Sequence, residues 1–101
     1  MNKNKKTLKE IFVEALQNYQ KGDLKTAENF CYKILSIDSN NFDSTFLLAS
    51  IFAKASSFDK AKQFLHKAIE IQPKNLSVLN NLGTAYKALG DRKEAINYYN
   101  K

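Results

Sequence analysis

The residues of this sequence best suited to chemistry are a single histidine, His66, and a single cysteine, Cys31. A structural or catalytic metal needs three or four ligands, and a cysteine nucleophile needs a neighbouring base to activate it. His66 has Lys67 beside it and no such set of ligands, so we interpret it as part of a solvent-facing helix surface. Glycine-rich phosphate loops and G-x-S-x-G motifs are also missing from the sequence. We therefore predict a protein that is not an enzyme and has no catalytic residue, metal or cofactor.

The composition is that of a small folded chain rich in helix. Of 101 residues, 44% are hydrophobic and 26% are charged, with three glycines and one proline. So few helix breakers favour long helices over short strands joined by turns. No apolar run approaches the roughly 18–20 residues that cross a bilayer, so we expect no membrane partner. The basic start, residues 1–6, is like that of a signal peptide, but Glu10 and Glu14 interrupt the segment that follows and no cleavage site appears. Together with the lone cysteine this indicates a cytoplasmic location.

The net charge of +6 comes mostly from the N-terminus. Four lysines, at positions 3, 5, 6 and 9, precede the first acidic residue. The remaining residues, 10–101, contain twelve basic and ten acidic side chains, so the folded body has no strong field of one sign. The charge pattern therefore gives no reason to expect a nucleic-acid partner.

A 34-residue repeat organises the sequence from residue 8 to the end. Ala27, Ala61 and Ala95 are spaced by this period, and four residues after each comes a larger side chain. Turn residues and segment ends follow the same spacing. The matched positions after the alanines are Cys31, Leu65 and Tyr99; the turns are Gly22, Ser56 and Gly90; the segment ends are Asn41 and Asn75.

Within each half-repeat the apolar residues recur at i, i+3, i+4 and i+7, the spacing of one buried helix face. Thr7 with Glu10 and Asp91 with Glu94 have the spacing of N-terminal caps, and Gly22 suits a left-handed helix end, as does Gly90. The pattern predicts helices at 8–21, 24–37, 42–55, 58–71, 76–89 and 92–101. We expect the aromatic residues at repeat positions to lie in the core: Phe30, Phe52, Phe64, Tyr86, Tyr98 and Tyr99.

The third repeat carries Leu79, Leu82-Gly83, Tyr86, Ala95 and Tyr99. This pattern resembles the tetratricopeptide repeat family, and the chain is similar to bacterial-type N-terminal arrays of that family. The resemblance implies an all-α fold, an α-solenoid of antiparallel helix hairpins with six helices, about 2.75 repeats and a right-handed superhelix. It implies a basic tail at 1–7 and an array at 8–101, divided into repeats at 8–41, 42–75 and an incomplete 76–101.

The first repeat departs most from this pattern. Glu14 and Asn18 stand where leucine and tyrosine are expected, so we expect the outer face of its first helix to be solvent-exposed, as suits the N-terminal end of an array. Cys31 occupies the position of Leu65 and Tyr99, which predicts a buried, unreactive thiol. The apolar stripe of the first repeat is formed by Phe12, Ala15, Leu16 and Tyr19.

The third repeat stops at Lys101, about eight residues short of a period, and no polar capping helix follows Tyr99. We interpret this open apolar edge as belonging to a fragment or to the start of a longer array. The alternative is that self-association, a following domain or a partner covers the edge.

In the tetratricopeptide family the first helix of each hairpin lines a concave groove, and the resemblance implies that a protein or peptide ligand lies there. The lysine and asparagine set that chaperone-binding members use is not reproduced, so we do not predict chaperone docking. Asn81 resembles the groove asparagine of protein O-linked sugar transferases, but it stands alone. The residues that the resemblance places near the groove are Phe12, Leu16, Tyr19, Phe46, Ser50, Lys54, Asn80, Asn81, Thr84 and Lys87.

The sequence thus favours a non-enzymatic protein-interaction scaffold that binds a peptide or helix in its groove. One alternative is the N-terminal targeting region of a larger bacterial enzyme, of glycosyltransferase or sulfotransferase type, because the segment 15–23 resembles the starts of such chains. RNA binding by a pentatricopeptide-like array is disfavoured by the 34-residue period and the low charge of residues 10–101.

Overall fold

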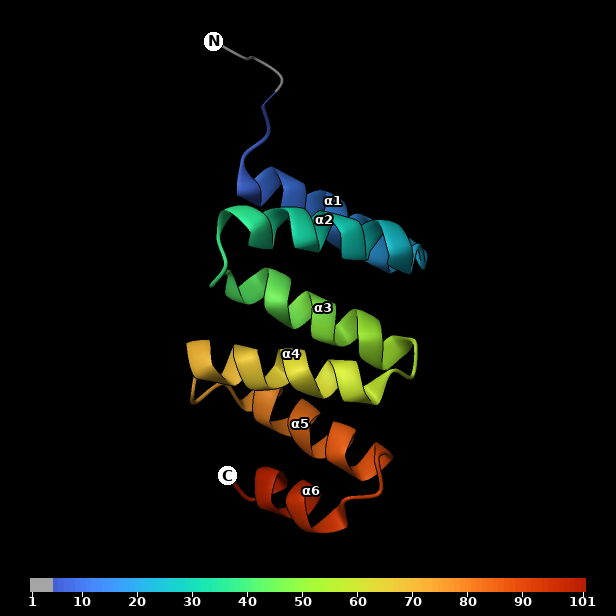
Figure 1. Cartoon of the computed structure of the whole chain (residues 1–101), viewed down its shortest axis with the longest axis vertical. Helices are drawn as coiled ribbons and strands as arrows, with labels where there is room; N and C mark the ends of the chain where they lie inside the picture. The colour runs from blue at the N-terminus through green and yellow to red at the C-terminus, as the bar shows by residue number, and fades with distance from the viewer. Residues whose placement is uncertain (1–4) are drawn as a thin grey trace.

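The computed structural model describes residues 5–101, which form six α-helices and no strand (Figure 1). The helices pair as antiparallel hairpins, α1 with α2, α3 with α4 and α5 with α6, and the hairpins stack along the long axis of a molecule measuring 54 × 26 × 17 Å. This arrangement confirms the predicted all-α solenoid of six helices. The helices are α1 (Leu8–Lys21), α2 (Leu24–Ile37), α3 (Phe42–Lys54), α4 (Phe58–Ile71), α5 (Leu76–Ala88) and α6 (Arg92–Tyr99).

The helix ends lie close to where the sequence predicts them, because local hydrogen bonds fix them. Thr7 and Glu10 form a complete capping box at α1, and Asp91 accepts a hydrogen bond from the backbone N–H of Glu94 at α6. Gly22 and Gly90 are left-handed, with φ of 89° and 84°. Helices α3 and α5 end one residue earlier than predicted, and α6 ends two residues earlier.

The alanines of the 34-residue period lie where the two helices of each hairpin cross. Ala27 and Ala61 have no exposed surface, and Ala95 is also buried. A side chain of this size lets two helices approach closely, which sets the geometry of all three hairpins. Larger buried residues fill the space around them in two core clusters, one including Ala15, Ala27, Cys31, Leu48 and Phe52, and one including Ala49, Leu65, Val78 and Leu82.

Aromatic side chains join the two helices within a hairpin, and they lie in or against the core as the sequence predicts, with one exception. Phe52 stacks on Phe64 with ring centroids 5.6 Å apart, and one repeat later Tyr86 stacks on Tyr98 at 5.4 Å. The prediction of a core position is wrong for Tyr99, which is 45% exposed. Helix α6 packs mainly against α5, so its other side, which includes Ile96, has no neighbouring helix to cover it.

The outer face of α1 is less exposed than the sequence predicts. Glu14 and Asn18 are each half-buried, and one carboxylate oxygen of Glu14 is buried without a hydrogen-bond partner. The other oxygen pairs with Lys6. The Asn18 side chain donates a 2.8 Å hydrogen bond to the backbone carbonyl of Glu14. Solvent exposure of this face is therefore a prediction that the structure corrects.

The longest helices within residues 5–101 have 14 residues, and none of these helices is both long and apolar enough to span a membrane.

Candidate binding groove

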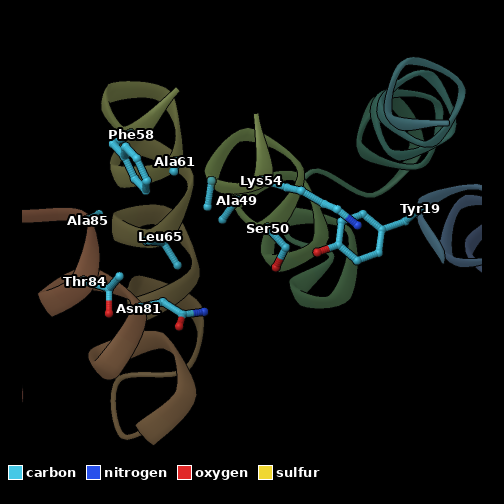
Figure 2. Close-up of a pocket in the computed structure, with 11 residues that line it drawn as sticks. Tyr19, Ala49, Ser50, Lys54, Phe58, Ala61, Leu65, Asn81, Thr84 and Ala85 are labelled. Carbon is cyan, nitrogen blue, oxygen red and sulfur yellow. The ribbon is translucent and has the colours of Figure 1, made fainter. Parts of the chain in front are cut away.

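A pocket of about 380 Å³ lies between α3, α4 and α5, and the side chain of Tyr19 reaches it from α1 (Figure 2). Its volume falls within the range of roughly 300–1,000 Å³ that is usual for ligand sites in proteins. The pocket is lined by Tyr19, Ala49, Ser50, Ala53, Lys54, Phe58, Ala61, Leu65, Asn81, Thr84 and Ala85.

Helical spacing explains why these residues come together. Ala49 and Ala53 are four residues apart on α3, as Ala61 and Leu65 are on α4, so each pair shows one helix face to the pocket. Asn81 and Ala85 have the same spacing on α5. The alanine side chains are short and leave space between the three helices that larger residues would fill. We call the apolar part of the lining the floor of the pocket; it consists of Ala49, Ala53, Phe58, Ala61, Leu65 and Ala85.

The remaining lining residues carry polar groups, and we call them the rim of the pocket: Tyr19, Ser50, Lys54, Asn81 and Thr84. The Lys54 Nζ atom lies 4.9 Å from the centre of the Tyr19 ring, an attractive cation–π contact that links α3 to α1. Ser50 donates a hydrogen bond to the carbonyl of Phe46, and Thr84 donates one to the carbonyl of Asn80. Lys54 is the only charged residue that lines the pocket, and it forms no ion pair with any group in residues 5–101.

Five of the ten residues that the sequence analysis placed near the groove line this pocket, and five lie elsewhere. Phe46 stacks on Phe42 at 5.7 Å and packs against the second core cluster. Phe12 packs against the first core cluster, while Leu16, Asn80 and Lys87 are exposed outside the pocket. A binding role for any of the ten stays a prediction. The five that line the pocket are Tyr19, Ser50, Lys54, Asn81 and Thr84.

The sequence analysis missed the floor of the pocket. Ala49, Ala53, Ala61 and Ala85 are residues that a helical repeat also uses for close packing, so their type alone does not distinguish floor from core. Phe58 and Leu65 come from α4, a second helix of a hairpin, whereas the resemblance pointed only to first helices. The one available signal was the pair of alanines at i and i+4 on α3, Ala49 and Ala53.

The interpretation of His66 as a solvent-facing residue is wrong. Its Nε2 atom lies 2.8 Å from the hydroxyl oxygen of Tyr86, and its ring meets those of Tyr86 and Tyr98 edge-on. Burial lowers the pKa of His66, and the positive charge of Lys62 lowers it further. This contact could not be predicted from the sequence, because Tyr86 lies 20 residues away on another helix.

Cys31 lies in the first core cluster, as predicted. Burial raises the pKa of its thiol to about 12, so the reactive thiolate is scarce near neutral pH. Within residues 5–101, no three His, Cys, Asp or Glu side chains are grouped where they could hold a metal ion.

Stacked antiparallel hairpins with a 34-residue period define a tetratricopeptide-type repeat array. Residues 20–101 match the family described as anaphase-promoting complex, cyclosome, subunit 3, and the chain belongs to that family.

A curated relative is the UDP-N-acetylglucosamine–peptide N-acetylglucosaminyltransferase of Caenorhabditis elegans, 28% identical over 95 residues. The match covers 94% of this chain but only 8% of that protein.

Two solved structures show the same fold. One MamA crystal structure superposes with a TM-score of 0.88 at 20% identity, covering 93% of this chain and 51% of that one. An O-GlcNAc transferase mutant from Thermobaculum terrenum gives a TM-score of 0.84 at 24% identity, covering 90% of this chain and 18% of that one. The present chain thus spans about half of MamA and a small part of the transferases.

Proposed function

We propose that this chain is a non-enzymatic scaffold that binds a peptide or helix of another protein in its groove. The observation that carries the proposal is the pocket between α3, α4 and α5, with an apolar floor, a polar rim and one lysine without an ionic partner. Membership of a tetratricopeptide-type family supports it, because stacked helical repeats create extended concave surfaces that suit protein ligands.

Binding of this kind would combine two contributions. An apolar side chain of the ligand would gain free energy by leaving water for contact with Ala53 and Phe58, the apolar lining residues that are partly exposed. The exposed Asn81 amide on the rim would offer a donor and an acceptor to the ligand backbone, which fixes its position and direction.

The proposal is tested with a phage-displayed library of random peptides selected on the immobilised protein. We expect enriched peptides to bind the wild-type chain and to lose most of their affinity for an Asn81→Trp variant, whose indole would occupy the pocket. Asn97→Trp is the matched control, because Asn97 is equally exposed but lies on α6 outside the pocket. Circular dichroism would show that both variants remain folded. Peptides that bind the Asn81→Trp protein as tightly as the wild type would refute the proposed groove.

A second candidate function is that of a repeat region within a larger glycosyltransferase. The match to the Caenorhabditis elegans enzyme favours it, because 94% of this chain aligns with a small part of that protein. Sequencing the gene downstream of Lys101 would test it. We expect an open reading frame that encodes a transferase domain, and an immediate stop codon would exclude this form of the hypothesis.

We also propose that the scaffold works in the cytoplasm, without a nucleic-acid partner. Cys31 is a free, buried thiol, as suits a reducing compartment, and residues 10–101 have nearly balanced charge. Fluorescence microscopy of the tagged protein and a salt titration of RNA binding would test these two points.

A further inference from the structure

We propose that the pocket selects peptides in which a bulky apolar side chain lies next to a carboxylate. This inference rests on the proposed function and adds the chemistry of the ligand. The apolar side chain would occupy the floor, and the carboxylate would bind the Lys54 ammonium group.

The floor suits a bulky apolar side chain because four of its residues are alanines, whose side chains are short. Ala53 and Phe58 keep part of their surface exposed to a ligand, while Ala49, Ala61, Leu65 and Ala85 are buried beside them. No charged group comes from this part of the pocket, so a ligand charge placed there would lose its water without finding a partner. An apolar side chain loses nothing of this kind, and it gains by covering the exposed surface of Ala53 and Phe58.

The rim suits a carboxylate because of the state of Lys54. Its ammonium group lies over the face of Tyr19, which holds the side chain in place but does not neutralise its charge. No acidic residue lines the pocket, and within residues 5–101 no carboxylate pairs with Lys54. A ligand carboxylate would therefore meet an unpaired cation that is already positioned, and would not have to displace an existing ion pair.

The two features lie close enough for one short ligand. Lys54 directly follows Ala53 on α3, and Figure 2 shows its side chain extending along the rim toward Tyr19, while Asn81 and Thr84 lie across the pocket on α5. A peptide that crosses between these two rims would place one side chain on the floor and present a neighbouring side chain to Lys54.

The probes for the test are four fluorescein-labelled peptides of equal length. Three have a central phenylalanine flanked by aspartate, by serine or by lysine, and the fourth has a central alanine flanked by aspartate. Fluorescence anisotropy with the wild-type protein should show tightest binding of the aspartate-flanked phenylalanine peptide. We expect about tenfold weaker binding for the serine-flanked peptide and for the alanine peptide, the size of effect expected from losing a charge-assisted hydrogen bond or a buried aromatic group.

Charge reversal separates recognition by Lys54 from general attraction to a basic protein. A Lys54→Glu variant should prefer the lysine-flanked peptide over the aspartate-flanked one, whereas the matched Lys93→Glu variant, altered at an exposed position on α6, should keep the wild-type order. Equal binding of all phenylalanine peptides, with loss of binding in Asn81→Trp, would overturn the carboxylate selection and leave the groove function standing. Binding insensitive to every pocket variant would overturn both.

Discussion

Gly83 on α5 leaves the space that the ring of Tyr99 on α6 occupies. A Cβ atom on Gly83 would lie 2.7 Å from Cε1 and 2.8 Å from Cδ1 of that ring, closer than carbon atoms approach without strain. The equivalent residues one repeat earlier are Ala49 and Leu65, which belong to the same core cluster. A smaller residue on α5 thus accompanies a larger one on α6 in the third repeat.

We predict that Gly83→Ala does not stabilise the protein, although alanine is favoured over glycine within a helix by about 1 kcal/mol. The new methyl group would push the Tyr99 ring away and break its 3.0 Å hydrogen bond with the Thr84 hydroxyl, and these losses offset the gain in helix propensity. Urea unfolding followed by circular dichroism measures the effect.

The matched background for this variant is Tyr99→Leu, which together with Gly83→Ala reproduces the Ala49 and Leu65 pair of the second repeat. In that background Gly83→Ala should stabilise the protein by about 0.5–1 kcal/mol. If Gly83→Ala had the same effect in both backgrounds, the two residues would not be coupled.

Ser56 provides a second prediction, because it has a left-handed backbone with φ of 61° where the other two hairpins have glycine. A residue with a Cβ atom in this region costs roughly 1–2 kcal/mol, which glycine avoids. Ser56→Gly should therefore raise the free energy of unfolding by about 0.5–1 kcal/mol, allowing for the greater freedom of glycine in the unfolded chain. The reverse substitution, Gly22→Ser, should lower it, and a gain in stability from Gly22→Ser would contradict the explanation.

Glu14 occupies the position of two fully buried leucines, Leu48 and Leu82, and one of its carboxylate oxygens is buried without a partner. We expect Glu14→Leu to stabilise the chain by about 1 kcal/mol, because it removes that buried oxygen and adds apolar packing. Thermal unfolding would measure it. A less stable variant would mean that the ion pair with Lys6 contributes more than the buried oxygen costs, and Lys6→Ala would then destabilise the wild type by a similar amount.

The lowered pKa of His66 predicts that acid destabilises the fold. In the folded chain burial and Lys62 disfavour the charged ring, while Glu70 and Glu94 partly oppose them. The unfolded chain therefore takes up a proton first as pH falls through the ordinary value of 6.5, and the stability contributed by neutral His66 is lost below that pH. The neutral ring can also accept a hydrogen bond from the hydroxyl of Tyr86, which a protonated ring cannot.

Urea unfolding at several values between about pH 8 and 5.5, above the range in which most carboxylates titrate, would detect this loss. The control is His66→Tyr, because a tyrosine, Tyr32, stands at the equivalent position one repeat earlier. A tyrosine side chain does not titrate in this pH range. We expect a flatter dependence of stability on pH in this variant. An identical dependence in both proteins would exclude His66 as its source.

The sequence by itself determined the repeat, the six helices and most of their ends. These features depend on local rules, which include the caps at Thr7 and Asp91, the left-handed glycines and the spacing of apolar residues along one helix face. The 34-residue period repeats the same sequence pattern in each hairpin, so a helix end that is ambiguous in one repeat can be predicted by comparison with the next. Half of the predicted groove residues also line the pocket, because the first helices of the hairpins share one side of the array.

Only the tertiary structure decided how side chains from different helices combine. The contact between His66 and Tyr86 and the position of Lys54 over Tyr19 join residues that are distant in sequence. The alanines of the pocket floor are of a type that also serves close packing. Periodicity states which face of a helix is buried, but not how far the neighbouring helix lies from it. That distance depends on the volumes of all residues packed between the two helices, so the pocket exists only once the hairpins have assembled.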